Sequence, residues 1–214
     1  MARSCSFFRR EKKEVYFRMI YVVRHGQTVW NLQKRKQGQM DSPLTLRGIN
    51  QAGLISDILK KEILDFRDFQ LVISPQWRCQ QFSSIICENI GVKFSDCIVE
   101  NDLKEHSFGF WEGLTEEEIE SEFPGMLAKR YSNWWEYVVP GGESYELLSK
   151  RVEKVLFRYY NKKVIFVCHE MVSKVLRGNY LNMNHEDVLK LKHEQNRVFK
   201  LENNKVQILE KKEK

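Results

Sequence analysis

The clearest chemical signal in the chain is the triplet Arg24-His25-Gly26, which follows a short apolar run over residues 19–23. The run is rich in β-branched and aromatic residues and too short for a helix, so it predicts a buried strand. Charged residues at the carboxyl end of such a strand face the crevice where α/β proteins bind ligands. A neutral imidazole there can attack phosphorus, and a guanidinium offers a planar fork that matches phosphate oxygens. The triplet therefore predicts phosphoryl-transfer chemistry, although so short a motif also arises by chance.

A second histidine stands in the equivalent position of another predicted strand. The apolar run over residues 164–168 is followed directly by His169 and Glu170. Because the carboxyl ends of parallel strands meet at one edge of a sheet, we expect His169 to lie on the same edge as His25.

The remaining sequence predicts the elements that position these histidines. Thr45, Thr115 and Ser144 are expected to cap helices, and Gly91 to end one. Alternating strands and helices predict an α/β fold with a mostly parallel sheet and helices on both sides. The expected helices cover about 46–60, 76–90 and 145–160, and another begins after Thr115 and is broken by Pro124-Gly125. The expected second strand covers 69–73, and a hairpin is expected around 203–204.

Length and charge limit the possible functions. The 214 residues suit one domain, expected over 19–214, behind a disordered extension over 1–18. Lys and Arg number 35 against 29 Asp and Glu, a net charge of +6 that suits an anionic substrate. The basic runs at the two ends also contain acids, and no stripe alternates aromatic and basic residues, so nucleic-acid binding is not expected.

Cysteine usage and hydropathy predict a cytoplasmic protein. The five cysteines are scattered without a CxxC pair, which indicates reduced thiols and neither a zinc nor a redox site. No apolar run approaches the roughly 20 residues that span a bilayer, so no membrane association is expected.

Six ordered blocks of sequence extend over about residues 19–202. They are Arg24-His25-Gly26 with Thr28 and Asn31; Gln37-Gly38 with Asp41-Ser42-Pro43-Leu44-Thr45; Ser74-Pro75 with Arg78; Leu103-Lys104-Glu105 with Phe108-Gly109-Phe110-Trp111-Glu112-Gly113; Pro140-Gly141-Gly142-Glu143-Ser144; and His169. In order and spacing they resemble the histidine phosphatase superfamily, which includes the cofactor-dependent phosphoglycerate mutases. The resemblance implies a three-layer αβα sandwich with a mostly parallel central sheet, forming a single catalytic domain.

The resemblance also implies a mechanism that needs no metal. His25 would accept the phosphoryl group, while Arg24, Arg78 and His169 would hold its oxygens and neutralise their charge. Glu105 would protonate the leaving oxygen and later activate water, which requires a raised pKa.

Other residues of the same blocks bear on these roles. Asn31 and Gly38 are expected to contact the phosphate or the substrate, and Thr28 is expected to line the pocket. The acids that compete with Glu105 for the role of proton donor are Glu100, Asp102 and Glu112.

The chain departs from the family pattern at three positions. Glu170 replaces the small residue usual after the second histidine, so a carboxylate either faces the phosphate pocket or points away from it. Phe82 stands where a threonine is usual, and Trp77 adds bulk beside Arg78. The histidines without motif support are expected on the surface: His106, His185 and His193.

The family contains phosphatases and mutases, which differ in what accepts the phosphate from the histidine. The forms of the blocks at 37–45 and 108–113 resemble the phosphatase branch, so we expect hydrolysis of a small phosphorylated metabolite without a cofactor. The alternative is a phosphoglycerate mutase primed by 2,3-bisphosphoglycerate. A weakly active binding or scaffold protein is a third reading, disfavoured because all four phosphate-handling residues are present.

Specificity is expected to lie in the region 114–139. Lys129, Arg130 and the tryptophans there could recognise an anionic or flat leaving group, or form an ordinary helical surface. The aromatic cluster at 134–137 is expected in the core or in a lid over the pocket. The oligomeric state, monomer or homodimer, stays open.

Overall fold

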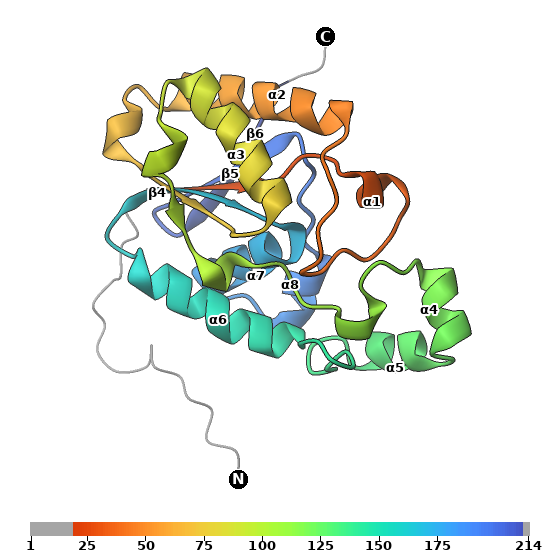
Figure 1. Ribbon diagram of the computed structural model, residues 1–214. Coiled ribbons are helices and arrows are strands. Elements are labelled where there is room, and N and C mark those ends of the chain that lie inside the picture. Colours follow the sequence, from red (N-terminus) through yellow and green to blue (C-terminus); the bar gives the residue numbers. More distant parts are fainter. Residues whose placement is uncertain (1–18, 212–214) are drawn as a thin grey trace.

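A six-stranded sheet forms the centre of the fold, in the order β3-β2-β4-β1-β5-β6 (Figure 1). The computed structural model describes residues 19–211, and the extension expected over 1–18 lies outside them. The first four strands pair in parallel, whereas the last two form an antiparallel hairpin along one edge. The strands are β1 (Met19–Arg24), β2 (Gln70–Ile73), β3 (Ile98–Val99), β4 (Lys163–Cys168), β5 (Arg197–Glu202) and β6 (Lys205–Glu210).

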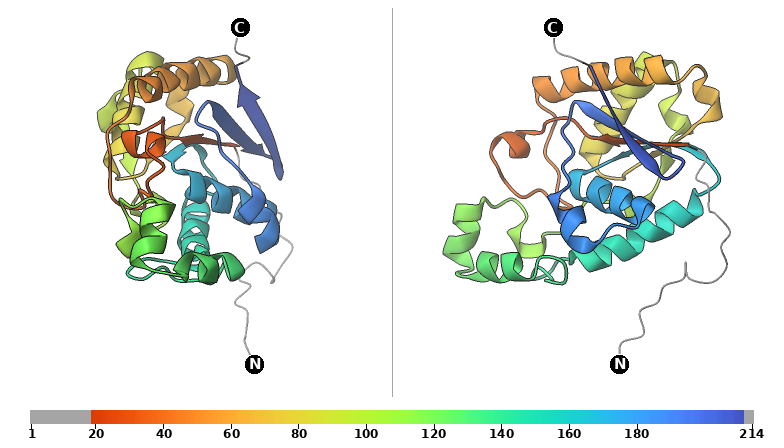
Figure 2. Two further views of the ribbon diagram at one scale, coloured as in Figure 1. Left: turned by 90° about the vertical axis from the view of Figure 1, so that its right-hand side faces the viewer. Right: turned by 180° about the vertical axis from the view of Figure 1, so that it is seen from behind.

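Helices cover both faces of this sheet and confirm the three-layer prediction. Helices α2 (Leu46–Glu62) and α3 (Trp77–Ile90) lie on one face, and α6 (Tyr145–Arg158), α7 (Glu170–Leu181) and α8 (His185–Lys190) lie on the other (Figures 1 and 2). Alternate residues of β1 enter the two cores, because successive side chains of a strand point to opposite faces. Burial on both faces explains why β1 and β4 read as continuous apolar runs.

Three shorter helices lie beside the sandwich: α1 (Val29–Leu32), α4 (Glu116–Glu122) and α5 (Met126–Ser132) (Figure 1). Helices α4 and α5 share a small apolar core of their own with the loop that precedes them. Its buried members are Phe108, Trp111, Ile119, Leu127 and Val139.

The predicted helix ends are confirmed. The side-chain oxygens of Thr45, Thr115 and Ser144 each accept a hydrogen bond from a backbone N–H of the first helical turn. Glu118 completes a capping box with Thr115. Helix α3 ends at Gly91, whose φ of +73° is the left-handed conformation that glycine adopts without strain.

The predicted hairpin is also confirmed. Asn203 and Asn204 have φ values of +51° and +55°, which matches the turn that joins two twisted strands through two residues.

The structure adds elements that the sequence pattern did not predict, namely α1, α5, α7, α8 and β3. Helix α7 follows its strand with no break, because His169 takes the N-cap position without forming a side-chain cap. Helix α5 restarts the chain after the Pro124-Gly125 break, with Gly125 at φ +73°. Strand β3 has only two residues, too few to show a period.

Four cysteines fall within the described residues, and all are free thiols: Cys79, Cys87 and Cys168 are buried, and Cys97 is half-buried. Over residues 19–211 no helix is long and apolar enough to cross a membrane.

Candidate active site

The two predicted histidines meet at the carboxyl edge of the sheet, as expected. Strands β1 and β4 are parallel neighbours with Arg24 opposite Cys168, and the backbone N–H of His25 donates to the Cys168 carbonyl at 3.0 Å. The rings of His25 and His169 lie edge to face with centroids 5.2 Å apart. This contact follows directly from strand register.

His25 is held in one tautomer. Its Nδ1 lies 2.8 Å from the carbonyl oxygen of Gly26, and because a carbonyl only accepts, Nδ1 carries the proton. Nε2 then keeps its lone pair and accepts a 3.3 Å hydrogen bond from Nε of Arg78. Burial, with the charges of Arg78 and Arg24, lowers the pKa of His25 well below its usual 6.5. The imidazole is therefore neutral and nucleophilic near neutral pH.

Arg78 is buried in the first turn of α3, with 1% of its surface exposed. Its Nη1 donates to the Met40 carbonyl and to Oδ1 of Asp41, each at 2.7 Å, and its Nη2 donates to the Gly38 carbonyl at 2.8 Å. A buried charge needs such partners. They fix the guanidinium against His25, at the wall of the pocket.

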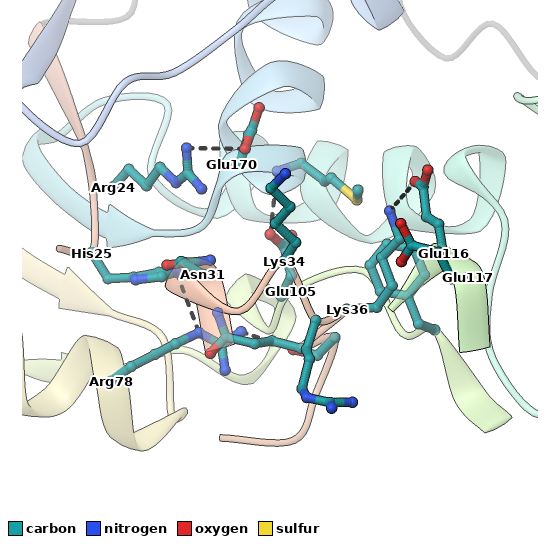
Figure 3. Close-up of a pocket in the computed structure, with 15 residues that line it drawn as sticks. Arg24, His25, Asn31, Lys34, Lys36, Arg78, Glu105, Glu116, Glu117 and Glu170 are labelled. Atoms are coloured by element: carbon teal, nitrogen blue, oxygen red, sulfur yellow. Dashed lines mark hydrogen bonds and ion pairs between the residues drawn. The ribbon is translucent and has the colours of Figure 1, made fainter. Parts of the chain in front are cut away.

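Arg24 enters the pocket from the other side of His25 (Figure 3). Its Nη1 donates to the His193 carbonyl at 2.6 Å and forms an ion pair with Oε2 of Glu170 at 2.9 Å. Its Nε is buried and has no hydrogen-bond partner among residues 19–211. That donor is suited to an anion.

Glu105 lies on the pocket wall with 8% of its surface exposed. Burial raises the pKa of its carboxyl, although hydrogen bonds from the His106 and Met171 N–H groups and the charge of Arg78 oppose the shift. Its own backbone N–H donates to Oε1 of Gln76 at 2.6 Å, which fixes its loop.

The competing acids of this loop do not line the pocket in the described part of the chain. Glu100 and Asp102 pair with Arg158. Glu112 accepts hydrogen bonds from the backbone N–H groups of Gln39, Met40 and Phe108. Glu105 is the one of the four that faces the site.

His169 is fully buried behind His25 rather than on the pocket surface. Its Nε2 lies 2.8 Å from Oγ of Ser74, and Sγ of Cys79 lies 3.5 Å from the same nitrogen. Burial, with the charges of Arg78 and His25, keeps its pKa well below 6.5, so its imidazole is neutral.

The pocket has a volume of about 500 Å³ and a mostly charged lining (Figure 3). Asn31 and Gly38 line it, and their contact with phosphate or substrate stays a prediction. Thr28 does not: within the described residues it is buried, and it caps α1 through the Asn31 N–H. The lining consists of Arg24, His25, Asn31, Lys34, Arg35, Lys36, Gln37, Gly38, Arg78, Glu105, Phe108, Glu116, Glu117, Glu170 and Met171.

The outer wall of the pocket was only partly predicted. Lys34, Arg35 and Lys36, from the loop after α1, were missed. Two of them fasten this loop to α4: Arg35 pairs with Glu118 at 2.5 Å and Lys36 with Glu116 at 2.6 Å. The run of three consecutive basic residues, together with the acidic run Glu116-Glu117-Glu118, was the signal available in the sequence.

The region expected to set specificity contributes differently from the prediction. Glu116 and Glu117 line the pocket, whereas Lys129, Arg130 and the tryptophans are not among the lining residues in the described chain. Arg130 is buried behind Phe108, with its Cζ 4.8 Å from the centre of that ring. Trp135 is buried and belongs to the large core beside the sheet, which favours the core alternative over a lid.

Two histidines expected on the surface are buried, so that expectation was wrong for His106 and His193. His106 packs between the rings of Phe108 and Tyr145. Nδ1 of His193 lies 2.7 Å from Oγ of Ser173, and its carbonyl accepts from Arg24. Only tertiary packing reveals these positions, whereas His185 is exposed as expected.

The three residues that depart from the family pattern lie in different environments. Phe82 is fully buried in the core on the α2 and α3 side, against Gly26. Trp77 is 61% exposed and does not line the described pocket. Glu170 lines the pocket and pairs with Arg24, so its carboxylate faces the phosphate pocket rather than pointing away from it.

Solved structures with the same fold include two phosphatases. Alpha-ribazole phosphatase from Shigella flexneri is 21% identical, with a TM-score of 0.79 over 90% of this chain and 96% of that one. A mycobacterial glucosyl-3-phosphoglycerate phosphatase solved with VO3 is 24% identical, with a TM-score of 0.74 over 90% of this chain and 97% of that one.

Curated relatives include bifunctional enzymes. Human 6-phosphofructo-2-kinase/fructose-2,6-bisphosphatase 3 is 31% identical over 186 residues, which are 86% of this chain and 34% of the relative. The chicken 6-phosphofructo-2-kinase/fructose-2,6-bisphosphatase is 29% identical over 185 residues, 86% of this chain and 37% of the relative. The chain thus spans about a third of the length of these relatives.

A mostly parallel sheet that presents two histidines and an arginine at its carboxyl edge, with a buried glutamate opposite, defines a class of α/β proteins that handle phosphate. The family model described as the histidine phosphatase superfamily, branch 1, matches residues 20–210. The chain belongs to this superfamily.

Proposed function

We propose that this protein is a phosphomonoesterase that hydrolyses a small phosphorylated metabolite through a phosphohistidine intermediate. The observation that carries the proposal is the state of His25. Its Nε2 is unprotonated and accepts from Arg78 at 3.3 Å, at the wall of a pocket that also contains Arg24 and Glu105.

In the first step, Nε2 of His25 attacks the phosphorus atom and the bond from phosphorus to the ester oxygen breaks. Glu105 gives its proton to the departing oxygen. Burial raises the pKa of Glu105, which favours the protonated form that this step requires. The products of this step are a free alcohol and phosphorylated His25.

In the second step, water attacks the phosphorus atom and the bond to Nε2 breaks. The carboxylate of Glu105 takes a proton from the attacking water, which restores the acid. Inorganic phosphate then leaves, and His25 is again neutral with its proton on Nδ1.

Positive charge around the phosphorus stabilises the transferring group. Once Nε2 of His25 bonds to phosphorus, the Nε–H of the fixed Arg78 is released from that nitrogen to donate to a phosphate oxygen, and Arg24 offers its unpartnered Nε. His169 packs against the ring of His25 from behind and holds it in position. Asn31 and Gly38 add contacts to phosphate or substrate. Thr28 acts by capping α1, so its contribution is to hold Asn31 in place.

The substrate class follows from the pocket lining and the relatives. Charged groups dominate the lining and Phe108 and Met171 are its large apolar members, which suits a small polar leaving group. The solved phosphatases of this fold are named for small phosphorylated metabolites. We also propose that the chain forms one catalytic domain of a cytoplasmic protein, because its described cysteines are free thiols.

The proposal is tested by phosphorus NMR of the purified protein with a panel of phosphomonoesters that includes 3-phosphoglycerate and a trace of 2,3-bisphosphoglycerate. We expect free phosphate and no 2-phosphoglycerate. Rapid formation of 2-phosphoglycerate would instead establish a mutase. The variant His25→Ala should release no phosphate, while His185→Ala, which changes an exposed histidine, serves as the matched control. No turnover of any ester, with phosphate still bound, would favour the scaffold alternative.

A further inference from the structure

The ion pair between Arg24 and Glu170 places a carboxylate inside the phosphate site. Glu170 is the first residue of α7, and its Oε2 lies 2.9 Å from Nη1 of Arg24. Its side chain is 33% exposed and that of Arg24 16%, so the pair faces the pocket yet is partly shielded from water. Shielded charges interact more strongly than exposed ones.

The surroundings of Glu170 fix its direction. Oε1 lies 3.8 Å from Nζ of Lys174, one turn further along α7. The carboxylate therefore lies between two cations, and the positive amino end of α7 favours its charge. Among the described residues Glu170 is the only carboxylate paired with Arg24.

Phosphate must compete with this carboxylate for the same guanidinium. Nη1 of Arg24 is already shared between Glu170 and the His193 carbonyl, while Nε has no partner in the described chain. A phosphate dianion that approaches Nε therefore meets the negative charge of Glu170 within the same small site. Like charges at this range oppose one another.

We propose that Glu170 is a counter-ion of Arg24 that competes with phosphate, so that the protein binds phosphate groups less tightly and releases inorganic phosphate faster. The inference rests on the proposed function for the role of Arg24 as a phosphate ligand. Glu170 is a positioning residue here, because it acts through Arg24. The same charge disfavours a leaving group with a second anionic group close to the ester.

Phosphate affinity measures this role without turnover. Inorganic phosphate is titrated calorimetrically into the full chain and into Glu170→Gln, Glu170→Asp and Glu117→Gln. We expect Glu170→Gln to bind phosphate about tenfold more tightly and Glu170→Asp to stay within about threefold of the wild type. Glu117 lines the same pocket without pairing to Arg24, so Glu117→Gln controls for the simple loss of a negative charge.

Kinetics give a second measure. With p-nitrophenyl phosphate, Glu170→Gln should lower KM and the inhibition constant of phosphate together. Its kcat/KM should rise more for 3-phosphoglycerate than for glycerol 3-phosphate, since only the former adds a carboxylate. Replacing a residue that merely supports the fold would increase neither the affinity for the ester nor the affinity for phosphate.

The outcomes separate the two proposals. The counter-ion role would be overturned if Glu170→Gln bound phosphate no more tightly than the wild type, or if Glu117→Gln gained as much phosphate affinity as Glu170→Gln. Either result would count even if the wild type hydrolyses esters. Tighter binding without turnover of any ester would refute the proposed function and retain the counter-ion role. No phosphate binding by either the wild type or Glu170→Gln would overturn both.

Discussion

Nε of Arg78 donates a 3.3 Å hydrogen bond to Nε2 of His25, so the site is already set for attack by that nitrogen. Since Gly26 holds the proton on Nδ1, Nε2 faces the pocket with a free electron pair. Arg78 lies in α3 and His25 directly follows β1, so only the fold brings them together.

Replacing Arg78 by Lys should lower kcat/KM by about 10²–10³-fold, because the lysine keeps a charge but loses the planar fork. The variant also removes the Arg78 donor from the Met40 carbonyl and leaves the Gly38 carbonyl with the side-chain amide of Gln76 as its donor, which lowers stability as well. Urea melts measured beside the kinetics separate the two effects. A kcat/KM within tenfold of the wild type would contradict the assigned role.

Replacing Glu105 by Gln should slow hydrolysis by about 10²–10⁴-fold for alkyl phosphates and far less for p-nitrophenyl phosphate, whose leaving group needs no proton. The ratio of the two rates is the measurement. Equal losses for both esters would point to an effect on binding rather than on proton donation.

Glu105→Gln should also change how the stability of the protein depends on pH. Burial raises the folded-state pKa of Glu105 above its unfolded value, so folding disfavours the ionised form. The wild type therefore loses stability as pH rises from the unfolded pKa near 4.5 to the folded pKa, and Gln does not. In urea melts, the unfolding free energy of Glu105→Gln should rise relative to that of the wild type as pH increases over that interval. A difference between the two proteins that does not change with pH would contradict the raised pKa of Glu105.

Four buried histidines predict sensitivity to mild acid. Burial lowers the pKa of His25, His106, His169 and His193 well below 6.5 in the folded protein. Their stabilising contribution is complete above the unfolded pKa and falls as pH drops below it, because the unfolded chain then binds more protons. Proton uptake by these four rings on unfolding should therefore rise from about one proton at pH 7 to nearly four at pH 5. Stability independent of pH across this interval would exclude neutral buried rings.

Replacing Gly38 by Ala should disrupt the loop that receives Arg78. Gly38 has a φ of +52°, and an added Cβ would lie 2.2 Å from Oε1 of Glu112, which backbone hydrogen bonds hold in place. We expect a loss of about 1–3 kcal/mol in unfolding free energy and weaker phosphate binding.

The matched control is Gly53→Ala, in the middle of α2, where an added Cβ meets nothing within 4 Å. That substitution should stabilise the protein by about 0.5–1 kcal/mol, because alanine favours a helix over glycine. Chemical denaturation of both variants measures the two changes in unfolding free energy. Equal behaviour at the two positions would show that the conformation of Gly38 is not constrained.

Local sequence predicted the parts of the site that strands and caps place. His25 and His169 follow apolar strands directly, so strand register alone brings them together, and Thr45 and Ser144 cap helices within three residues of their own position. The sequence could not predict that the His193 carbonyl holds Arg24, because 169 residues separate them.

Charge alone was a poor guide to position at Arg130. Its helix turns the side chain into an aromatic cluster behind Phe108 rather than into the pocket, and Glu116 and Glu117 of α4 line the pocket instead. These outcomes depend on how α4 and α5 pack beside the sandwich. The hydrophobic periodicity within each helix does not encode that packing.

The phosphohistidine itself can be trapped by quenching the full chain with alkali during turnover of a phosphomonoester, digesting it and locating the phosphate by mass spectrometry. We expect an acid-labile phosphate on the peptide that contains His25, absent in His25→Ala. Phosphate on His169, or continued turnover with no phosphohistidine at any time, would exclude His25 as the nucleophile.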